Sequence, residues 1–272
     1  MPIFKLDTII QGIQKKPIKF FLYGANGVGK THVSGQFPHP IFMDLEDGLA
    51  GQDYSRQPIT SFDEAKAFIS FLKEAAHPFK TLVIDSMDRL EKLAYPKACE
   101  EEGLRNLYEG YGKGLVCLEK LFLELRDDIS SLIATRPMNV IFISHEKIRH
   151  IQMLGRPAHD LIVPALHDRL WPIFADWCNL VGQAYFLLKT QEVHDLGFNK
   201  KQVIASQDHK TFESGSRLLR VDPSDNVAIC KNRFRFNTLI KEERIDTYSI
   251  PFSATSILGQ IRQFYKQHEG EK

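Results

Sequence analysis

The amino-acid sequence predicts an α/β fold with a mostly parallel central sheet that is flanked by helices. Short, wholly apolar runs, which are typical of strands buried on both faces, alternate with segments of helical periodicity. The predicted parallel strands are residues 18–23, 41–44, 81–85 and 139–144. A glycine-rich turn directly follows the first of these runs and opens the first predicted helix. This alternation indicates a sheet that is covered on both sides.

The predicted helices rest on apolar spacing and on signals at helix ends. The second one begins at a capping box, because Ser61 stands three residues before Glu64 and ahead of an apolar run. The predicted helices are residues 30–36, 62–75, 88–101, 115–133 and 256–267. Residues 103–114 carry four glycines, and we expect them to form a mobile loop.

The pattern changes after the fourth strand, where residues 145–168 are polar. Further strand-like runs predict antiparallel strands toward the C-terminus. These runs are residues 179–188, 202–206, 226–230 and 246–250. No repeat or linker interrupts the chain, so we expect an N-terminal extension at residues 1–16 and one domain at residues 17–260. Residues 261–272 would then be a helix end and a tail.

The composition is that of an ordinary globular protein. The 272 residues include 35 Lys and Arg against 34 Asp and Glu, so the net charge of +1 gives no prior for a nucleic-acid partner. The four cysteines are far apart, which argues against a zinc ribbon or a disulfide framework. We find neither a signal peptide nor an apolar run long enough to span a bilayer, and we expect a cytoplasmic protein without membrane association.

The most specific motif is a phosphate-binding loop of the form G-x-x-x-x-G-K-[ST], placed between the first predicted strand and helix. Its glycines let backbone N–H groups turn toward phosphate oxygens, and the helix N-terminus adds partial positive charge. Lys30 is expected to reach the β- and γ-phosphates, and the Thr31 hydroxyl to ligate Mg²⁺. The residues predicted to bind nucleotide are Gly24, Ala25, Asn26, Gly27, Val28, Gly29, Lys30, Thr31 and His32.

Two acidic residues follow predicted strands. Asp85 ends residues 81–85, where a P-loop fold needs a carboxylate beside the magnesium; the alternative is a cap for the next helix. Glu46 follows residues 41–44 and is expected to polarise the water that attacks the γ-phosphate. For Glu46 the alternative is a solvated acidic turn.

His145 follows the strand at residues 139–144, and we expect it to touch the γ-phosphate. His150, His159 and His167 lie close to it in sequence, but their spacing does not match that of compact metal-ligand pairs. The sequence therefore favours a phosphate contact over a metal site.

Other basic residues are candidates for binding phosphate. Lys231 and Arg233 alternate after the predicted strand at residues 226–230, so their side chains point to one face. One interpretation is that they bind phosphate, in the same subunit or across an interface. The alternative is that they belong to a solvated edge strand. Further basic residues lie in two expected loops, of which the glycine-rich one also carries Tyr108 and Tyr111. Basic and aromatic residues together suit single strands, but polar residues are also common in exposed loops. The candidates for DNA binding are Arg105, Lys113, Lys147, Arg149 and Arg156.

Taken together, these motifs resemble the RecA-like recombinases, and most closely the small phage and prophage ATPases of the single-strand-annealing type that carry the label AAA domain. Residues 41–49 resemble the family strand whose glutamate is the catalytic base, which maps to Glu46. Residues 82–86 resemble its Walker B strand, and residues 140–145 resemble the strand that bears the γ-phosphate sensor. The recombinases carry glutamine where this chain has His145, and a histidine can still donate one hydrogen bond.

The resemblance implies a RecA-type P-loop NTPase core that uses ATP and Mg²⁺. It implies that loops near residues 105–114 and 146–160 bind single-stranded DNA, and that residues 231–234 reach the nucleotide of a neighbouring subunit. The implied partners are single-stranded DNA, further copies of the chain in a ring or filament, and a phage single-strand-binding or replication protein. The implied role is phage recombination or annealing in a bacterial host cell.

Other function classes stay open from the sequence. A helicase loader or another DNA motor uses the same loop and would bind a protein partner tightly. A small-molecule kinase usually needs an arginine-rich lid, and the sequence has no arginine-dense insertion. A module that binds ATP without hydrolysing it is the third alternative.

Overall fold

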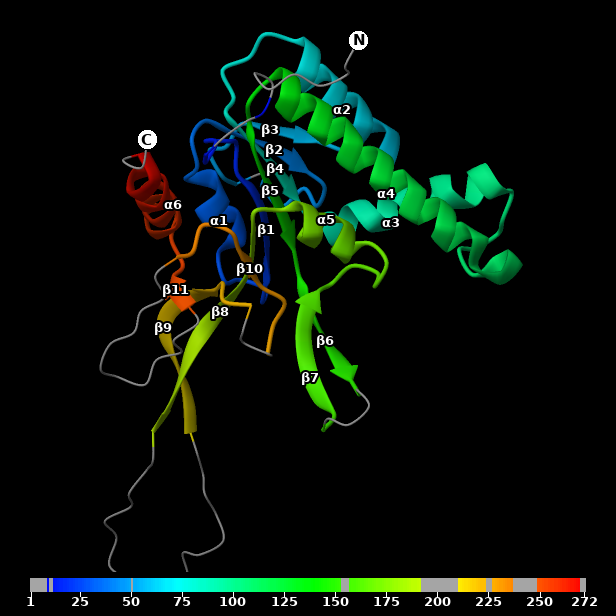
Figure 1. Ribbon diagram of the computed structural model, residues 1–272. Helices are drawn as coiled ribbons and strands as arrows, with labels where there is room; N and C mark the ends of the chain where they lie inside the picture. Colours follow the sequence, from blue (N-terminus) through cyan, green and yellow to red (C-terminus); the bar gives the residue numbers. More distant parts are fainter. Residues whose placement is uncertain are drawn as a thin grey trace, which may run out of the picture.

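The computed structural model describes residues 9, 12–49, 51–152, 157–191, 210–223, 227–236 and 249–269. Its centre is one large sheet with the strand order β11-β9-β8-β1-β5-β4-β2-β3, and β10 pairs with β8 outside this path (Figure 1). The strands of this sheet are β1 (Lys19–Gly24), β2 (Pro40–Asp44), β3 (Arg56–Pro58), β4 (Thr81–Asp85), β5 (Asn139–Ser144), β8 (Leu180–Gln191), β9 (Lys210–Arg220), β10 (Lys231–Asn232) and β11 (Ser249–Pro251).

The strand directions confirm the predicted mostly parallel sheet. Strands β3, β2, β4, β5, β1 and β8 run parallel, whereas β9, β10 and β11 pair antiparallel. The four parallel strands predicted from apolar runs correspond to β1, β2, β4 and β5. Since β5 lies between β1 and β4, the strand that precedes the P-loop and the strand that ends at Asp85 are separated by one strand.

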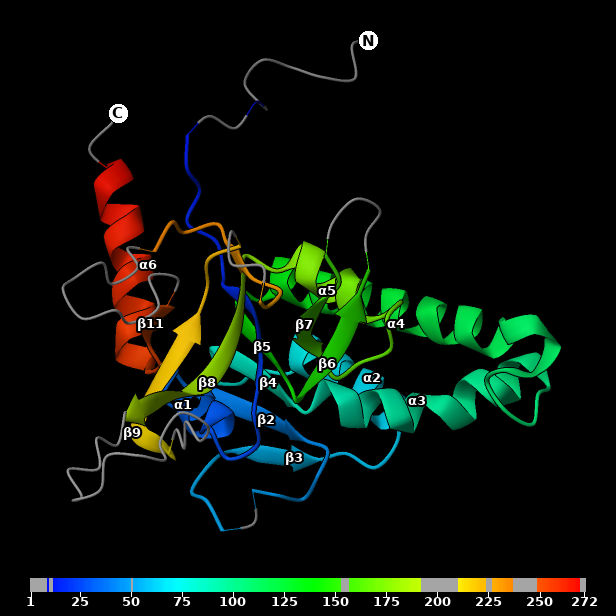
Figure 2. The same ribbon diagram turned by 90° about the horizontal axis from the view of Figure 1, so that it is seen from below.

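The apolar runs form strands because both faces of the sheet are covered by helices. Phe21 and Tyr23 of β1 belong to one core, together with residues of α2 (Phe62–Glu74), α3 (Met87–Glu102), α4 (Glu109–Thr135) and α5 (Trp171–Trp177). Phe20 and Leu22 alternate with them and enter a second core with α1 (Lys30–Gly35) and α6 (Ala254–Glu269). Figure 2 shows α6 on one side of the sheet and α2 to α5 on the other.

The predicted capping box of α2 is present in a shifted form. The Ser61 hydroxyl accepts a hydrogen bond from the Glu64 N–H at 3.2 Å, as the motif requires. The Glu64 carboxylate, however, accepts from the backbone N–H of Thr60 at 2.7 Å, one residue earlier than expected.

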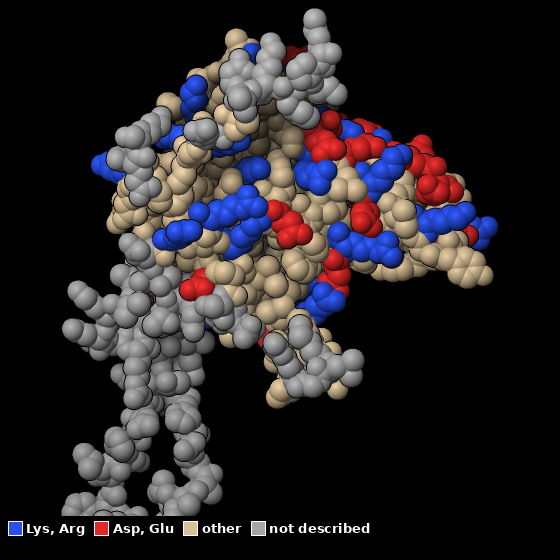
Figure 3. Space-filling model, in the orientation of Figure 1, with Lys and Arg blue, Asp and Glu red and all other residues tan. Residues whose placement is uncertain are grey.

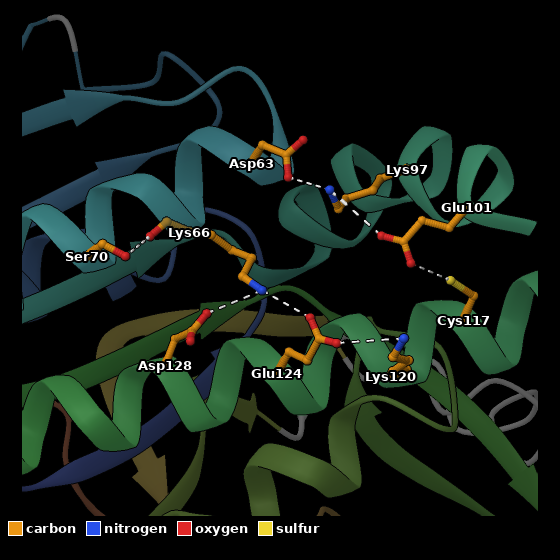
Figure 4. Close-up of polar contacts among 9 residues, drawn as sticks. All are labelled: Asp63, Lys66, Ser70, Lys97, Glu101, Cys117, Lys120, Glu124 and Asp128. Carbon is orange, nitrogen blue, oxygen red and sulfur yellow. Dashed lines mark hydrogen bonds and ion pairs between the residues drawn. The ribbon is translucent and has the colours of Figure 1, made fainter.

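Ion pairs join the outer faces of α2, α3 and α4. Lys66 of α2 contacts Glu124 at 3.1 Å and Asp128 at 3.5 Å on α4, and Lys97 of α3 contacts Asp63 at 2.6 Å (Figure 4). These side chains are partly exposed, so each pair stabilises the fold by only about 0–1 kcal/mol. The apolar residues beneath them hold the helices on the sheet.

The glycine-rich segment at residues 103–114 differs from the predicted loop. Helix α4 begins at Glu109, and Gly110, Tyr111 and Gly112 in its first turns have φ values of 62°, 60° and 81°. Two of these three left-handed residues are glycines, which adopt this conformation without steric cost. The glycines therefore form a kink at the start of a helix.

The polar segment after β5 is a β-hairpin and not the expected loop. Strands β6 (Glu146–Ile151) and β7 (His159–Pro164) pair antiparallel and extend from the end of β5 (Figure 1). Most residues of β6 are at least partly exposed, so polar side chains hid its strand pattern in the sequence.

The remaining predictions for the C-terminal part have mixed outcomes. Residues 179–188 form part of β8, and residues 256–267 lie in α6. The predicted strand at residues 226–230 is wrong for the described residues 227–230, where only Ala228 forms an isolated bridge, and the strand β10 follows at Lys231–Asn232. Residues 202–206 lie outside the described residues, and at residues 246–250 the structure has β11 from Ser249 onward.

Among the residues that the structure describes, no helix has both the length and the apolar character needed to cross a bilayer.

Candidate nucleotide-binding site

The glycines of the predicted phosphate-binding loop occupy positions that disfavour other residues. Gly24 has φ of 152°, and a Cβ atom on it would lie 2.0 Å from the Ala184 carbonyl oxygen of β8. Gly27 and Gly29 have φ values of 72° and 94°, in the left-handed region. The loop therefore turns sharply between β1 and α1 and directs the N-terminus of α1 toward the cavity beside it.

The Lys30 side chain is held inside this loop. It is 7% exposed, and its Nζ donates hydrogen bonds of 2.9 Å to the carbonyl oxygens of both Gly24 and Ala25. Burial lowers the pKa of Lys30, while the carboxylates of Asp85 and Asp88 act in the opposite direction. The ammonium is thus fixed where a phosphate would meet the loop.

Thr31 and Asp85, the two predicted magnesium ligands, are in direct contact. The Thr31 hydroxyl donates to Asp85 Oδ2 at 2.6 Å. Burial raises the pKa of Asp85 to about 6, and the nearby Glu46 adds to this effect, whereas Thr31 and Lys30 oppose it. A hydroxyl and a carboxylate at this distance are the hard oxygen donors that Mg²⁺ prefers.

Of the acidic residues Asp44, Glu46 and Asp47 at and beyond the end of β2, Glu46 is the one that is placed for chemistry. Its side chain is exposed to the cavity, and its Oε1 accepts a hydrogen bond of 2.5 Å from the Ser86 hydroxyl. Asp44 also lines the cavity but is 3% exposed and forms an ion pair with Arg56 at 3.3 Å. Glu46 therefore has a carboxylate oxygen available beside the phosphate loop.

His145 lines the same cavity and is bound by Asp88, a residue that the sequence analysis did not select. The two oxygens of Asp88 accept from the backbone N–H of His145 at 3.0 Å and from its ring Nδ1 at 2.8 Å. Asp88 stands in the first turn of α3, three residues after Asp85, and that position was the available signal.

Ligand atoms of Glu46, Asp88 and His145 lie within 4.8 Å of one another, a distance at which a metal ion could also be considered. Both oxygens of Asp88 are already engaged by the two N–H groups of His145. We therefore interpret this group as a hydrogen-bonded pair beside Glu46 and not as an ion site.

The cavity that these residues share has a volume of about 300 Å³. Six of the nine residues predicted to bind nucleotide line it, and Val28 instead has its side chain in the core with α1 and α6. The six are Asn26, Gly27, Gly29, Lys30, Thr31 and His32. Since the other lining residues lie at the carboxyl ends of β2, β4 and β5 or follow these strands, the site lies at the carboxyl edge of the parallel sheet.

A second residue missed by the sequence analysis is Arg217 of β9. Its Nη1 donates to the Val28 carbonyl oxygen at 3.4 Å and lies 2.5 Å from the position of a Cβ built on Gly29. The guanidinium therefore contacts the phosphate loop from the side of β9. No local signal could identify it, because Arg217 is far from the loop in sequence.

Lys231 and Arg233 lie at the opposite edge of the sheet. Lys231 pairs with Val181, which is in register with Phe21 near the beginning of β1. The Lys231 ammonium donates to the carbonyl oxygens of Ala175 and Asp176, next to the end of α5. Neither basic residue lines the cavity of its own subunit.

The predicted DNA-binding residues fall on two separate projections. Arg105 lies between α3 and α4, and Lys113 lies near the beginning of α4. Positive and negative side chains are interspersed on the surface of these helices (Figure 3). Lys147 and Arg149 of β6 both pair with Asp168, at 3.3 Å and 3.5 Å. Arg156 lies outside the described residues.

We expect Asp85→Asn to stabilise the magnesium-free protein at pH 7.5. Since the pKa of Asp85 is raised from 3.8 to about 6, the folded state binds its proton more tightly than the unfolded chain, and stability decreases as pH rises between these values. The asparagine can still accept from Thr31, so urea unfolding in EDTA should show a gain of roughly 1–3 kcal/mol at pH 7.5.

This gain should vanish below pH 4. The matched control is Asp47→Asn, whose side chain is exposed. A loss of stability that is the same at every pH would contradict the assignment of Asp85 as a buried, strained carboxylate.

The chain is 27% identical over 148 residues to the SPbeta prophage-derived uncharacterized protein YorG of Bacillus subtilis (strain 168). The match covers 52% of this chain and 44% of YorG, so it spans less than half of that relative. The crystal structure of the RadB recombinase aligns with 74% of this chain and 78% of that chain, at 16% identity and a TM-score of 0.37.

The family comparison covers more of the chain than either relative does. The model of the family AAA_24, described as AAA domain, matches residues 16–218. This range contains the phosphate loop, Glu46, Asp85, His145 and Arg217. The chain therefore belongs to the AAA domain family AAA_24.

Proposed function

We propose that the protein is a magnesium-dependent ATPase of the RecA type that acts on single-stranded DNA in phage recombination or annealing. The observation that carries the ATPase part is the convergence on one cavity of a buried lysine, a contacting hydroxyl–carboxylate pair and a separate glutamate. These are the groups that phosphoryl transfer to water requires.

Each residue would have a distinct task in hydrolysis. Lys30 would move from the carbonyl oxygens of the loop to the β- and γ-phosphates, which offer stronger, charged acceptors. Thr31 and Asp85 would hold Mg²⁺, which neutralises charge on the phosphate oxygens when bound. Glu46 would orient the attacking water and accept its proton, with Ser86 fixing the carboxylate.

The hairpin of β6 and β7 supports a link between nucleotide and DNA. His145 immediately precedes β6, and its carbonyl oxygen accepts a hydrogen bond of 2.8 Å from Ala165 N–H at the end of β7. A shift of His145 toward a γ-phosphate would therefore move both ends of the hairpin that carries Lys147 and Arg149. Basic residues on such an element suit a nucleic-acid backbone.

The position of Lys231 and Arg233 supports self-association. Both lie at the amino edge of the sheet, so they can serve a nucleotide only in another subunit. A contact between the amino edge of one subunit and the carboxyl edge of the next is head-to-tail, and it produces a ring or a filament. A phage single-strand-binding or replication protein would be a further partner of this assembly.

The hydrolytic role of Glu46 is tested by Glu46→Gln. The glutamine keeps the size of the side chain but cannot accept the proton of water, so steady-state ATP turnover should fall by about 10²–10³-fold. ATP affinity, measured by calorimetry, should stay within about threefold because the phosphate contacts are unchanged.

Asp47→Asn is the matched control, because Asp47 is exposed next to Glu46 but does not line the nucleotide cavity. If Glu46→Gln retains at least half of the wild-type turnover, Glu46 is not the base. If the wild-type protein binds ATP without turning it over, the protein is a binding module.

The DNA role is tested by the salt dependence of single-strand binding. The double variant Lys147→Ala/Arg149→Ala should weaken affinity for an oligonucleotide in the presence of a non-hydrolysable ATP analogue. Each lost phosphate contact should reduce the slope of log K against log salt by about 0.7. Arg126→Ala on α4, which removes an exposed ion pair with Asp127, is the control and should change neither quantity.

The DNA role would be contradicted if the wild-type protein did not bind single-stranded DNA at any salt concentration of the series and if DNA did not change its ATP turnover. Tight capture of a replicative helicase in the same state would then favour the helicase loader.

A further inference from the structure

We propose that Asp88 is a positioning residue that keeps His145 in the one state in which it can donate a hydrogen bond to the terminal phosphate. The inference rests on the proposed ATPase function and specifies how its sensor works. It concerns a residue pair of this chain, since a glutamine at position 145 would need no such partner.

Two hydrogen bonds hold the ring and the backbone of His145 against Asp88. Asp88 uses both carboxylate oxygens on the same residue, with Oδ1 bound to the His145 backbone N–H at 3.0 Å and Oδ2 bound to ring Nδ1 at 2.8 Å. The ring cannot rotate without losing the second bond. Asp88 has a side-chain exposure of 12%, so water does not readily replace these contacts.

Asp88 also determines where the His145 ring carries its proton. An ionised carboxylate only accepts hydrogen bonds, so Asp88 fixes the proton on Nδ1 and leaves Nε2 for other contacts. In a neutral ring Nε2 would then carry a lone pair, which repels a phosphate oxygen. With the proton held on Nδ1, only the imidazolium form presents an N–H at Nε2. The His145 ring can therefore donate a hydrogen bond to a γ-phosphate only when the ring is protonated.

The charges around His145 act on its protonation. The charged groups that face His145 are Asp88 of α3, Glu46 after β2 and Lys30 of α1. The hydrogen bond from His145 to Asp88 raises the pKa of His145; burial and Lys30 oppose this effect, and Glu46 adds to it.

Asp88 responds in the complementary direction. Burial alone would raise the pKa of the Asp88 carboxyl group, but the side-chain and backbone hydrogen bonds from His145 outweigh burial and lower it. Asp88 therefore stays ionised where His145 is protonated, and the two form an ion pair at the edge of the cavity. Glutamine would donate its hydrogen bond at any pH, whereas this pair donates only below the pKa of His145.

The test compares pH profiles of ATP turnover for the wild-type protein, Asp88→Asn, His145→Gln and the double variant. The wild-type kcat/KM should fall on the alkaline side as His145 loses its proton. Asp88→Asn keeps the bond to the backbone N–H but turns its amide N–H toward Nδ1, so the neutral ring carries its proton on Nε2 and the alkaline limb should disappear. Above the pKa of His145, Asp88→Asn should therefore retain the kcat/KM that the wild-type protein loses.

His145→Gln should abolish this alkaline limb, and adding Asp88→Asn to it should change nothing further in the profile. As a direct readout, NMR titration of the His145 ring in the nucleotide-free protein should show a lower pKa in Asp88→Asn than in the wild type. Thermal melting of all variants identifies any that fail to fold.

Three results would overturn the proposal while leaving the ATPase intact: an alkaline limb that persists in Asp88→Asn, a loss by the same factor at every pH, or an additive effect in the double variant. If the wild-type protein neither binds nor hydrolyses ATP, the proposed function itself is wrong and the sensor role falls with it. A lowered His145 pKa in the NMR titration of Asp88→Asn would then leave only a structural ion pair.

Discussion

The ammonium of Lys30, bound by two carbonyl oxygens of its own loop, is the interaction on which the site depends. A buried charge of this kind is stable only where dipoles replace water, and Gly24 and Ala25 provide them. The loop can do so because Gly24 has no Cβ that would collide with the Ala184 carbonyl of the neighbouring strand. The pairing of β1 with β8 therefore determines the shape of the loop, and the shape of the loop determines the position of the Lys30 ammonium.

The same arrangement stores electrostatic strain. Lys30 and Asp85 are buried with their pKa values displaced toward the neutral forms, and Asp44 and Glu46 lie nearby. Such a cluster lowers the stability of the magnesium-free protein, and a triphosphate with a divalent cation would relieve it by supplying the missing charges. The residues that destabilise the protein without nucleotide are thus the residues that would bind the triphosphate and its cation.

Parallel strands explain why distant segments meet. Glu46, Asp85 and His145 each stand at or just beyond the carboxyl end of a strand, and the register of β2, β4 and β5 brings those ends into one row. The adjacent helix α3 then holds His145 through Asp88, while its Glu91 accepts a hydrogen bond of 2.8 Å from His167 N–H beyond the hairpin. One helix thereby secures both sides of the hairpin next to the site.

The sequence predicted the parallel sheet and the phosphate loop because their signals are local: an apolar run, a glycine spacing and a lysine in fixed order. It did not predict the hairpin after β5, because exposed polar residues hide the alternation of a strand that no core covers. Nor could it find Arg217 or the Asp88 contact, since both depend on segments brought together by the sheet. The role proposed for Lys231 involves a second subunit, so neither the sequence nor one folded chain can test it.

The most direct measurement of the central claim is the affinity for MgATP of the wild-type protein and of Lys30→Ala, by calorimetry at fixed salt. We predict a loss of about 10- to 150-fold, since a charge-assisted contact to phosphate contributes about 1.5–3 kcal/mol. Lys120→Ala, on the exposed face of α4, should bind like the wild type. Equal affinities for Lys30→Ala and the wild type would contradict the assignment of this loop as the nucleotide site.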